Sequence, residues 1–333
     1  MLAEKKVAVT GGAGFLGSHV VGELLANHNA VVVLDDFSNG KMQHLEPWRD
    51  NPDLTIIRGD ITEKNDVNKA FQGTDIVIHL AVLGLRQSIK DPMRVSDVIV
   101  NGTLNCLNAA LENKIDLFVN CSSSEAYGSA RYVPMDENHP LMPETPYAAA
   151  KVAQDMYVSS YGRTYQLPWL TVRPFNMYGP HSHWQGMRGE LIPKMIVRAM
   201  NRQPLFVFGD GGQTRDFIYV DDAARTITAV AGIPECQSRT INICSGKETA
   251  IIKIAELIAE SFSLDPAAAI QKQEARPGDV RRHLGDNSQL KRFVNPESFV
   301  SIEEGIARTI AWFKSLPESP EVLLSQEKVR AWE

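Results

Sequence analysis

Tyr147 and Lys151 stand four residues apart in the segment TPYAAAKVAQDMY, residues 145–157. On a helix these two side chains share one face. An ammonium group beside a phenol favours the phenolate, and a second cation close by would lower the tyrosine pKa further, towards neutral pH. Such a phenolate is a base that can take the proton of a hydroxyl group. The alternative is a chance pairing on a helix surface, and only the surrounding motifs distinguish the two.

The stretch SSSEAYG, residues 122–128, brings three hydroxyl groups and a carboxylate together just after the apolar run LFVNC. Polar residues at the end of a buried strand either cap the strand or belong to an active site. Ser122 and Ser124 suit the first role. Ser123 suits the second, because a reaction that turns an alcohol into a ketone needs a small donor on that oxygen.

Gly11, Gly14 and Gly17 form G-x-x-G-x-x-G between an apolar strand and a helical segment. Glycine permits a tight turn there, and the free N–H groups at the helix start favour a pyrophosphate. Asp35 follows 18 residues after Gly17, where an acid accepts the ribose hydroxyls of NAD. An NADP site would more often have an arginine here, and only Lys41 is nearby, so the pattern favours NAD. A plain tight turn is the alternative.

Asp60 stands at the end of a third apolar run. This position suits contact with the adenine of the cofactor, and the alternative is that Asp60 caps a loop. The residues predicted to bind the cofactor are Gly11, Gly14, Phe15, Leu16, Gly17, Asp35, Asp36, Asp60, Ile61, Leu80, Ala81, Tyr147 and Lys151.

Apolar strand-like runs alternate with helical segments through the first half of the chain. This alternation predicts an α/β fold with a doubly wound parallel sheet over residues 1–175. After about residue 176 shorter elements predict a smaller mixed α/β lobe, 176–320, whose elements interleave with the first. The stretch YGPHSHWQGMRGE suggests a long surface loop where the first domain passes into this lobe. Residues 321–333 read as a peripheral tail.

The composition is that of an ordinary globular protein: 333 residues, 44% hydrophobic and 22% charged, with a formal net charge of -6. Without a basic patch, nucleic acid is not expected as a partner. No histidine spacing suits a metal, and HSH at 181–183 is the tightest pair. No apolar run approaches the roughly 20 residues of a membrane helix. Four cysteines without a C-x-x-C pair and an N-terminus without a leader pattern predict a reducing, cytoplasmic setting.

These motifs occur together with RPFNMYGP (173–180), FGDGGQTRDFIYVDD (208–222) and RPGDVRR (276–282). The ordered set resembles the extended short-chain dehydrogenase/reductase family, and within it the nucleotide-sugar epimerase/dehydratase branch that includes UDP-glucose 4-epimerases. The resemblance implies a Rossmann-type domain with a C-terminal sugar-nucleotide lobe. It also implies a tightly held NAD that is recycled in each turnover, and a homodimer formed through two helices per subunit.

The resemblance implies that Ser123 hydrogen-bonds the sugar O4 and shares its proton with Tyr147, while Lys151 completes the catalytic set. A sugar nucleotide, with a UDP-sugar favoured, carries a diphosphate that fixed cations should hold. The alternative for Arg215 and Arg276 is a surface salt bridge, and the alternative for Phe206 is core packing. The expected substrate-binding residues are Arg86, Ser123, Ser124, Asn176, Phe206, Arg215, Arg276 and Asp279.

The chain departs from familiar relatives at Gly84, where some carry lysine, and at Ile99, where an asparagine often touches the cofactor. The NAD-linked 4,6-dehydratases usually show Thr-Asp-Glu where this chain has Ser123, Ser124 and Glu125. Serine is a poor general acid, which argues against the standard dehydratase. Glu125 remains open as a base at C5, a group that orients the sugar, or a cap of the next turn.

Every reading shares one step: Tyr147 removes the O4 proton and NAD+ takes the C4 hydride. We expect a nucleotide-sugar epimerase, in which the keto sugar turns and hydride returns to its other face. A 4,6-dehydratase and a UDP-glucuronate decarboxylase are the alternatives, and the second would need a cation for the sugar carboxylate, for which Arg86 is the candidate. A non-catalytic NAD-binding sensor or scaffold is the rival from another class; such proteins tend to lose the Tyr147–Lys151 pair.

Overall fold

The computed structural model describes residues 2–274 and 280–328, and the predicted Arg276 and Asp279 therefore lie outside the described residues. Its largest element is a parallel sheet of seven strands in the order β10-β6-β5-β4-β1-β2-β3. These strands are β1 (Lys6–Thr10), β2 (Ala30–Asp35), β3 (Leu54–Arg58), β4 (Ile76–His79), β5 (Leu117–Cys121), β6 (Trp169–Pro174) and β10 (Arg239–Ile243). The doubly wound fold expected from the alternating pattern is confirmed.

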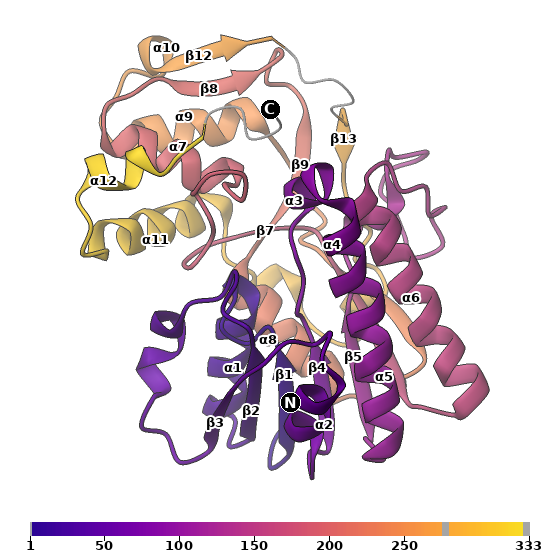
Figure 1. Ribbon diagram of the computed structural model, residues 1–333. Coiled ribbons are helices and arrows are strands. Elements are labelled where there is room, and N and C mark those ends of the chain that lie inside the picture. The colour runs from indigo at the N-terminus through magenta and orange to yellow at the C-terminus, as the bar shows by residue number, and fades with distance from the viewer. Residues whose placement is uncertain (1, 275–279, 329–333) are drawn as a thin grey trace.

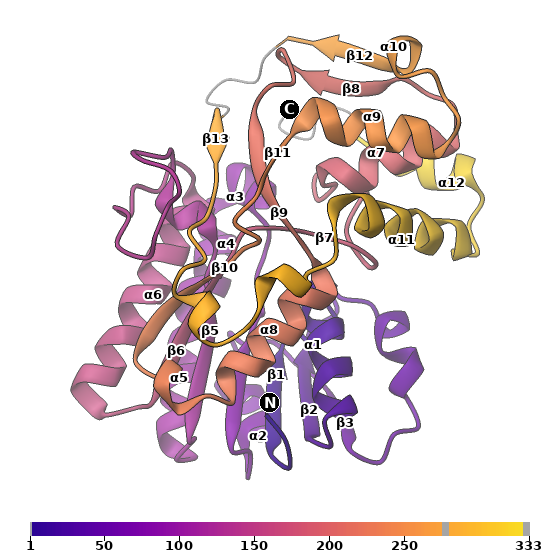
Figure 2. The same ribbon diagram turned by 180° about the vertical axis from the view of Figure 1, so that it is seen from behind.

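Helices cover both faces of this sheet (Figures 1 and 2). One face carries α1 (Phe15–Ala26) and α8 (Val220–Ala231), and the other carries α2 (Lys64–Phe71), α5 (Gly102–Glu112) and α6 (Pro146–Tyr165). Short helices α3 (Leu85–Lys90), α4 (Pro92–Ser96) and η2 (Asp97–Asn101) precede α5, and η1 (Met42–Trp48) follows β2.

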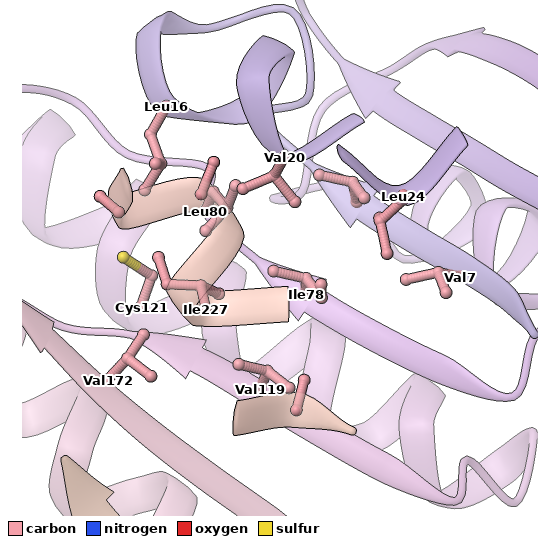
Figure 3. Close-up of a cluster of buried hydrophobic side chains, with 14 of the residues drawn as sticks. Val7, Leu16, Val20, Leu24, Ile78, Leu80, Val119, Cys121, Val172 and Ile227 are labelled. Carbon is pink, nitrogen blue, oxygen red and sulfur yellow. The ribbon is translucent and has the colours of Figure 1, made fainter. Parts of the chain in front are cut away.

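The central strands are buried on both faces because they are mostly apolar, as in AVVVLD of β2 and IVIH of β4. In β1, Val7 and Val9 point into the layer shared with α1 and α8, while Ala8 points into the opposite layer. Figure 3 shows Val7 beside Leu24 in the first of these layers, with Ile227 of α8 in the same cluster. Both α8 and β10 come from beyond residue 176, so the chain returns to the first sheet after it has begun the second lobe.

The second lobe lies above the carboxyl ends of the sheet in Figure 1. One of its sheets contains β7 (Asn176–Tyr178), β9 (Thr214–Tyr219), β11 (Glu248–Ala250) and β13 (Arg282–His283). A two-stranded parallel sheet joins β8 (Leu205–Phe208) to β12 (Ile270–Gln273). Its helices are α7 (Leu191–Met200), α9 (Ile251–Ser261), α10 (Pro266–Ala269), α11 (Ile302–Ser315) and α12 (Pro320–Ser325).

The predicted peripheral tail begins as helix α12 and then docks on the second lobe. The Glu327 carboxylate lies 2.7 Å from Arg198 and 3.6 Å from Lys194, and the Gly186 N–H donates to the Gln326 carbonyl oxygen at 2.8 Å. Across the two described ranges, no helix has the length and apolarity needed to cross a bilayer. Nor do the described residues include a group of three or more side chains suited to a metal ion.

A buried ion pair ties the central strands to α6. The Asp155 carboxylate accepts from the Arg173 guanidinium at 2.9 and 3.0 Å, and both side chains are about 5% exposed or less. The same carboxylate accepts from Ser122 Oγ at 2.8 Å and from Asn120 Nδ2 at 2.9 Å. This network holds the end of β5, and with it the serine run, against α6.

We expect Asp155→Asn to lower the free energy of unfolding by about 3–5 kcal/mol, because it leaves the Arg173 charge buried and uncompensated. Urea denaturation measures the change. Asp116→Asn, which breaks the exposed pair with Lys5 at 3.6 Å, is the matched control and should have little effect. Equal small losses in both variants would contradict a structural role for the Asp155 pair.

Candidate active site

A cavity of about 810 Å³ lies between the carboxyl ends of the parallel strands and the second lobe. In doubly wound sheets this is where ligands bind, because neighbouring strand ends diverge there. Its lining includes every predicted cofactor-binding residue, together with Ser123, Ser124, Glu125, Asn176, Arg86 and Arg215. The fold therefore gathers residues that are more than 200 positions apart in the chain, from Gly11 to Arg215, around one space.

The glycine turn packs backbone segments so closely at the start of α1 that side chains would not fit. Gly11 has φ +71°, and a Cβ atom there would lie 2.8 Å from the backbone of Ala81. A Cβ at Gly17 would collide with the Gly11 carbonyl oxygen. Gly14 begins α1 without a side-chain cap, so the first helical N–H groups face the cavity side of the turn. These features fit the pyrophosphate of a dinucleotide.

Asp35 closes β2 beside this turn. Its carboxylate accepts from the backbone N–H groups of Ala13 at 2.9 Å and Phe37 at 2.8 Å, and burial raises its pKa above the usual value. Asp60 also lines the cavity, where it accepts from the Thr62 N–H at 2.8 Å and lies 3.0 Å from Arg94. Asp60 thus caps its loop and faces the cavity at once.

Tyr147 stands in the first turn of α6, which Thr145 caps by accepting the Ala148 N–H at 3.1 Å. The Tyr147 N–H donates to Ser88 Oγ at 3.1 Å, which anchors the helix start to α3. One turn later, Lys151 Nζ lies 6.0 Å from the centre of the Tyr147 ring. The same Nζ donates to the Cys121 carbonyl oxygen at 2.8 Å and to Gln154 Oε1 at 2.9 Å.

The pKa of Tyr147 differs from the lowered value that the Tyr-Lys pair led us to expect. Burial raises it above the usual value, the hydrogen bond with Ser123 opposes the rise, and the negative groups Glu125 and Glu190 add to it. Burial also lowers the pKa of Lys151. Removing water penalises both charged forms, so a cation bound against the phenol ring would be needed to favour the phenolate.

The serine run leads into a short 3-10 helix, η3 (Ser124–Tyr127). Ser123 caps this helix by accepting the Glu125 N–H at 3.2 Å, and its hydroxyl also lowers the pKa of Tyr147. Glu125 lines the cavity, and burial raises its pKa while Arg215 and Arg86 oppose the rise.

The remaining predicted substrate residues differ in their positions. Arg215 and Asn176 line the cavity on the second lobe, where Arg215 donates to the carbonyl oxygens of Thr214 at 2.8 Å and Val280 at 2.7 Å. Among the described lining residues, Phe208 is present and Phe206 is not. Phe206 instead lies under the Arg198 guanidinium, which is 4.0 Å from the centre of its ring.

Several lining residues were not anticipated from the sequence. The stretch expected to be a surface loop folds over the cavity and contributes His183, Met187, Arg188 and Glu190 to its lining. Burial raises the pKa of Glu190 to about 7. No motif surrounds Glu190, and a lone glutamate in a polar stretch carries no signal of its own.

Comparison with known proteins supports the family resemblance that the sequence motifs indicated. The model of the NAD dependent epimerase/dehydratase family matches residues 7–244. A putative UDP-glucose 4-epimerase of Methanocaldococcus jannaschii is 33% identical over 313 residues, which are 93% of this chain and 98% of that protein.

Solved structures of two activities are equally similar. A dTDP-glucose 4,6-dehydratase from Streptomyces venezuelae, solved with NAD, has a TM-score of 0.86 and 31% identity, covering 93% of this chain and 97% of that one. A UDP-N-acetylglucosamine 4-epimerase from Methanobrevibacter ruminantium also has a TM-score of 0.86, with 32% identity, covering 94% of this chain and 99% of that one. The chain belongs to the NAD-dependent epimerase/dehydratase family, the nucleotide-sugar branch of the extended short-chain dehydrogenases/reductases.

Proposed function

We propose that the protein is a nucleotide-sugar 4-epimerase that works through a transient 4-keto sugar. The observation that carries this proposal is the meeting of Ser123, Tyr147 and Lys151 on one wall of a cavity whose other wall carries Arg215 and Asn176. One wall has the groups that move a proton, and the other has groups suited to a diphosphate.

In this proposal the Tyr147 phenolate takes the proton of the sugar O4 and later returns it. Bound NAD+ supplies the hydride acceptor that makes C4 a ketone and the donor that restores the alcohol. Ser123, which lines the same cavity as Tyr147, donates to the same oxygen and holds it as its bonding changes. Lys151 holds its ammonium group near the ring because it donates hydrogen bonds to the Cys121 carbonyl oxygen and to Gln154 Oε1.

An epimerase must let the sugar turn while the rest of the substrate stays fixed. Arg215 is held by two carbonyl oxygens, and the Asn176 Nδ2 donates to the Asp216 carbonyl oxygen at 3.1 Å. Fixed side chains of this kind suit a diphosphate anchor. Arg276 and Asp279 are proposed to complete the nucleotide site, with UDP as the favoured nucleotide.

A 4,6-dehydratase is the second candidate, and Glu125 is the observation that favours it. Its carboxyl group lies in the cavity beside Ser123, and its raised pKa suits a group that takes and gives protons. Ser124 cannot replace the acid that expels the C6 hydroxyl in the usual dehydratase pattern, so the epimerase remains the first candidate.

We also propose a homodimer that forms through α5 and α6, which lie side by side in Figure 1. Met156 is 49% exposed and Tyr157 is 40% exposed on α6, and two-fold pairing would bury both.

The four cysteines are buried and free, which suits the reducing conditions of a cytoplasm.

Tyr147→Phe is expected to lower turnover about 100-fold or more, because no other group takes the O4 proton. NAD content, measured by absorbance after denaturation, should stay the same. Tyr165→Phe, at the exposed end of the same helix, is the matched control. Retained activity in Tyr147→Phe would refute the mechanism.

Glu125→Gln separates the two candidates when it is combined with product mass on a panel of sugar nucleotides. An epimerase should keep most of its activity and give a product of unchanged mass, because Glu125 moves no proton in that reaction. A dehydratase should lose activity and, in the wild type, give a product lighter by one water. A crippled variant whose wild-type product has unchanged mass would contradict both assignments of Glu125.

Sedimentation velocity tests the dimer. The wild type should sediment at twice the chain mass of 36.9 kDa, and Met156→Glu should shift it towards one chain, because a buried carboxylate disfavours the interface. Met42→Glu, which changes an exposed methionine on η1, is the control and should remain dimeric. A wild type that sediments as one chain would overturn the proposal.

A further inference from the structure

Residues 181–190, in the segment that links β7 to α7, lie between the two lobes (Figure 1). We call them the strap. Each residue of the strap is buried or only partly exposed, although the sequence predicted a surface loop. His183, Met187, Arg188 and Glu190 line the cavity. Because a polar segment leaves water only where other groups satisfy it, the contacts of the strap indicate its role.

One side of the strap is fixed to the second lobe. Trp184 is 4% exposed, and the centre of its ring lies 5.3 Å from that of Phe313 in α11. The Gly186 N–H donates to the carbonyl oxygen of Gln326, which directly follows α12. The last residue of the strap, Glu190, directly precedes α7. These contacts make the strap part of the second lobe.

The other side of the strap is hydrogen-bonded to the first domain at two separate places. Arg188 Nη1 donates to Asn39 Oδ1 at 2.7 Å and to the Ser38 carbonyl oxygen at 3.2 Å. The Arg86 guanidinium donates to the Gly189 carbonyl oxygen at 2.7 Å. These first-domain partners follow β2 and β4, the two strands that flank β1 in the sheet. The strap therefore crosses the carboxyl end of β1, where the glycine turn begins.

A pair of stacked imidazoles joins the start of the strap to the glycine turn itself. The rings of His181 and His44 are 4.1 Å apart and nearly parallel, at 3°. His44 Nδ1 donates to the Ala13 carbonyl oxygen at 2.9 Å, and His181 Nδ1 lies 2.8 Å from Ser18 Oγ in α1. Burial lowers the pKa of His44 to about 4 and that of His181 to about 3, so like charge does not oppose the stack at neutral pH.

The first-domain residues that hold the strap belong to the cofactor site or contact it. Ser38 and Asn39 line the cavity together with Asp35, the acid that suits the ribose of NAD. Ala13, whose carbonyl oxygen holds His44, donates its own N–H to Asp35 at 2.9 Å. A dinucleotide held by the glycine turn and Asp35 therefore shares the cavity with the strap.

We propose that the strap is the gate of the cofactor site: NAD enters and leaves only when the strap opens, and the hydrogen bonds of Arg188 to Ser38 and Asn39 hold it closed. Arg188 is thus a positioning residue, which acts on the cofactor through the strap. The contacts join protein groups to one another, so the gate slows capture and release alike. The inference depends on the NAD site of the family and not on which sugar reaction the protein catalyses.

Arg188→Ala tests the gate in the NAD-containing protein. Bound radiolabelled NAD is chased with an excess of unlabelled NAD, and the label that stays with the protein is followed by gel filtration. Release should be about tenfold faster than in the wild type, or more, because two hydrogen bonds from a charged donor are lost. Arg188→Lys keeps a charged donor and should release NAD more slowly than Arg188→Ala.

The dissociation constant distinguishes a gate from a direct contact between Arg188 and the cofactor. Labelled NAD is left to equilibrate with the protein over a range of concentrations. A gate changes capture and release together, so the dissociation constant of Arg188→Ala should stay within about threefold of the wild type. A direct contact would weaken binding by the same factor as it speeds release, and that result overturns the gate.

His181→Asn tests the strap at a residue that is not among the described residues lining the cavity. The change removes the stack on His44, and asparagine tolerates the left-handed backbone at this position, where φ is +66°. NAD release should again be faster, by about threefold or more, because the loss of the stacked ring loosens the same strap.

Arg308→Ala is the matched control for the loss of a positive charge. It changes an exposed arginine of α11 that pairs with Glu304 in the same helix, and it should leave the rate of NAD release unchanged. The melting temperature and the NAD content at saturation show whether each variant is folded.

The outcomes decide the gate separately from the proposed reaction. A wild-type rate of release in a folded Arg188→Ala overturns the gate, and so does an equal acceleration in Arg308→Ala, which would assign the effect to net charge. If Arg188→Ala does not fold, an unchanged rate in His181→Asn overturns it. None of these rates reports which sugar is converted, so the epimerase assignment is tested only by product analysis.

Discussion

The active-site wall depends on one hydrogen bond between an ammonium group and a strand end. Lys151 Nζ donates to the carbonyl oxygen of Cys121, the last residue of β5, from the second turn of α6. This bond sets the position of α6 relative to the serine run, and therefore of Tyr147 relative to Ser123. Because Lys151 is almost fully buried, a loss of this contact would leave a charge without compensation.

The Asp155–Arg173 pair supports that hydrogen bond from one turn further along α6. Asp155 holds Ser122, the residue between Cys121 and Ser123, so the strand end is fixed on both sides of the carbonyl that Lys151 uses. Burying an ion pair costs desolvation energy, and replacing it with apolar residues is often neutral for stability. Its value here is positional, since apolar packing would not fix the direction of the Ser123 hydroxyl.

Charge also accounts for how the cavity divides between its two walls. The second lobe presents Arg215 and Asn176, which suit a diphosphate, while Glu125 and Glu190 line the cavity and act on the pKa of Tyr147. The same division raises the pKa of Tyr147, because burial and the nearby carboxylates both disfavour a phenolate. The positive charge of a bound cofactor would offset this effect and favour the phenolate.

Local patterns in the sequence determined the sheet, the glycine turn, Asp35 and the Tyr147–Lys151 pair, because each depends on short spacing: buried strands, a turn that only glycine permits, and one helix face. Other features depended on contacts between distant segments. Only the tertiary structure returned α8 and β10 to the first sheet, packed Phe206 under Arg198, and brought the Gly189 carbonyl oxygen to Arg86 from more than 100 residues away in the chain. No local pattern encodes such meetings, since a lone charge shows its role only when the fold supplies its partner and removes its water.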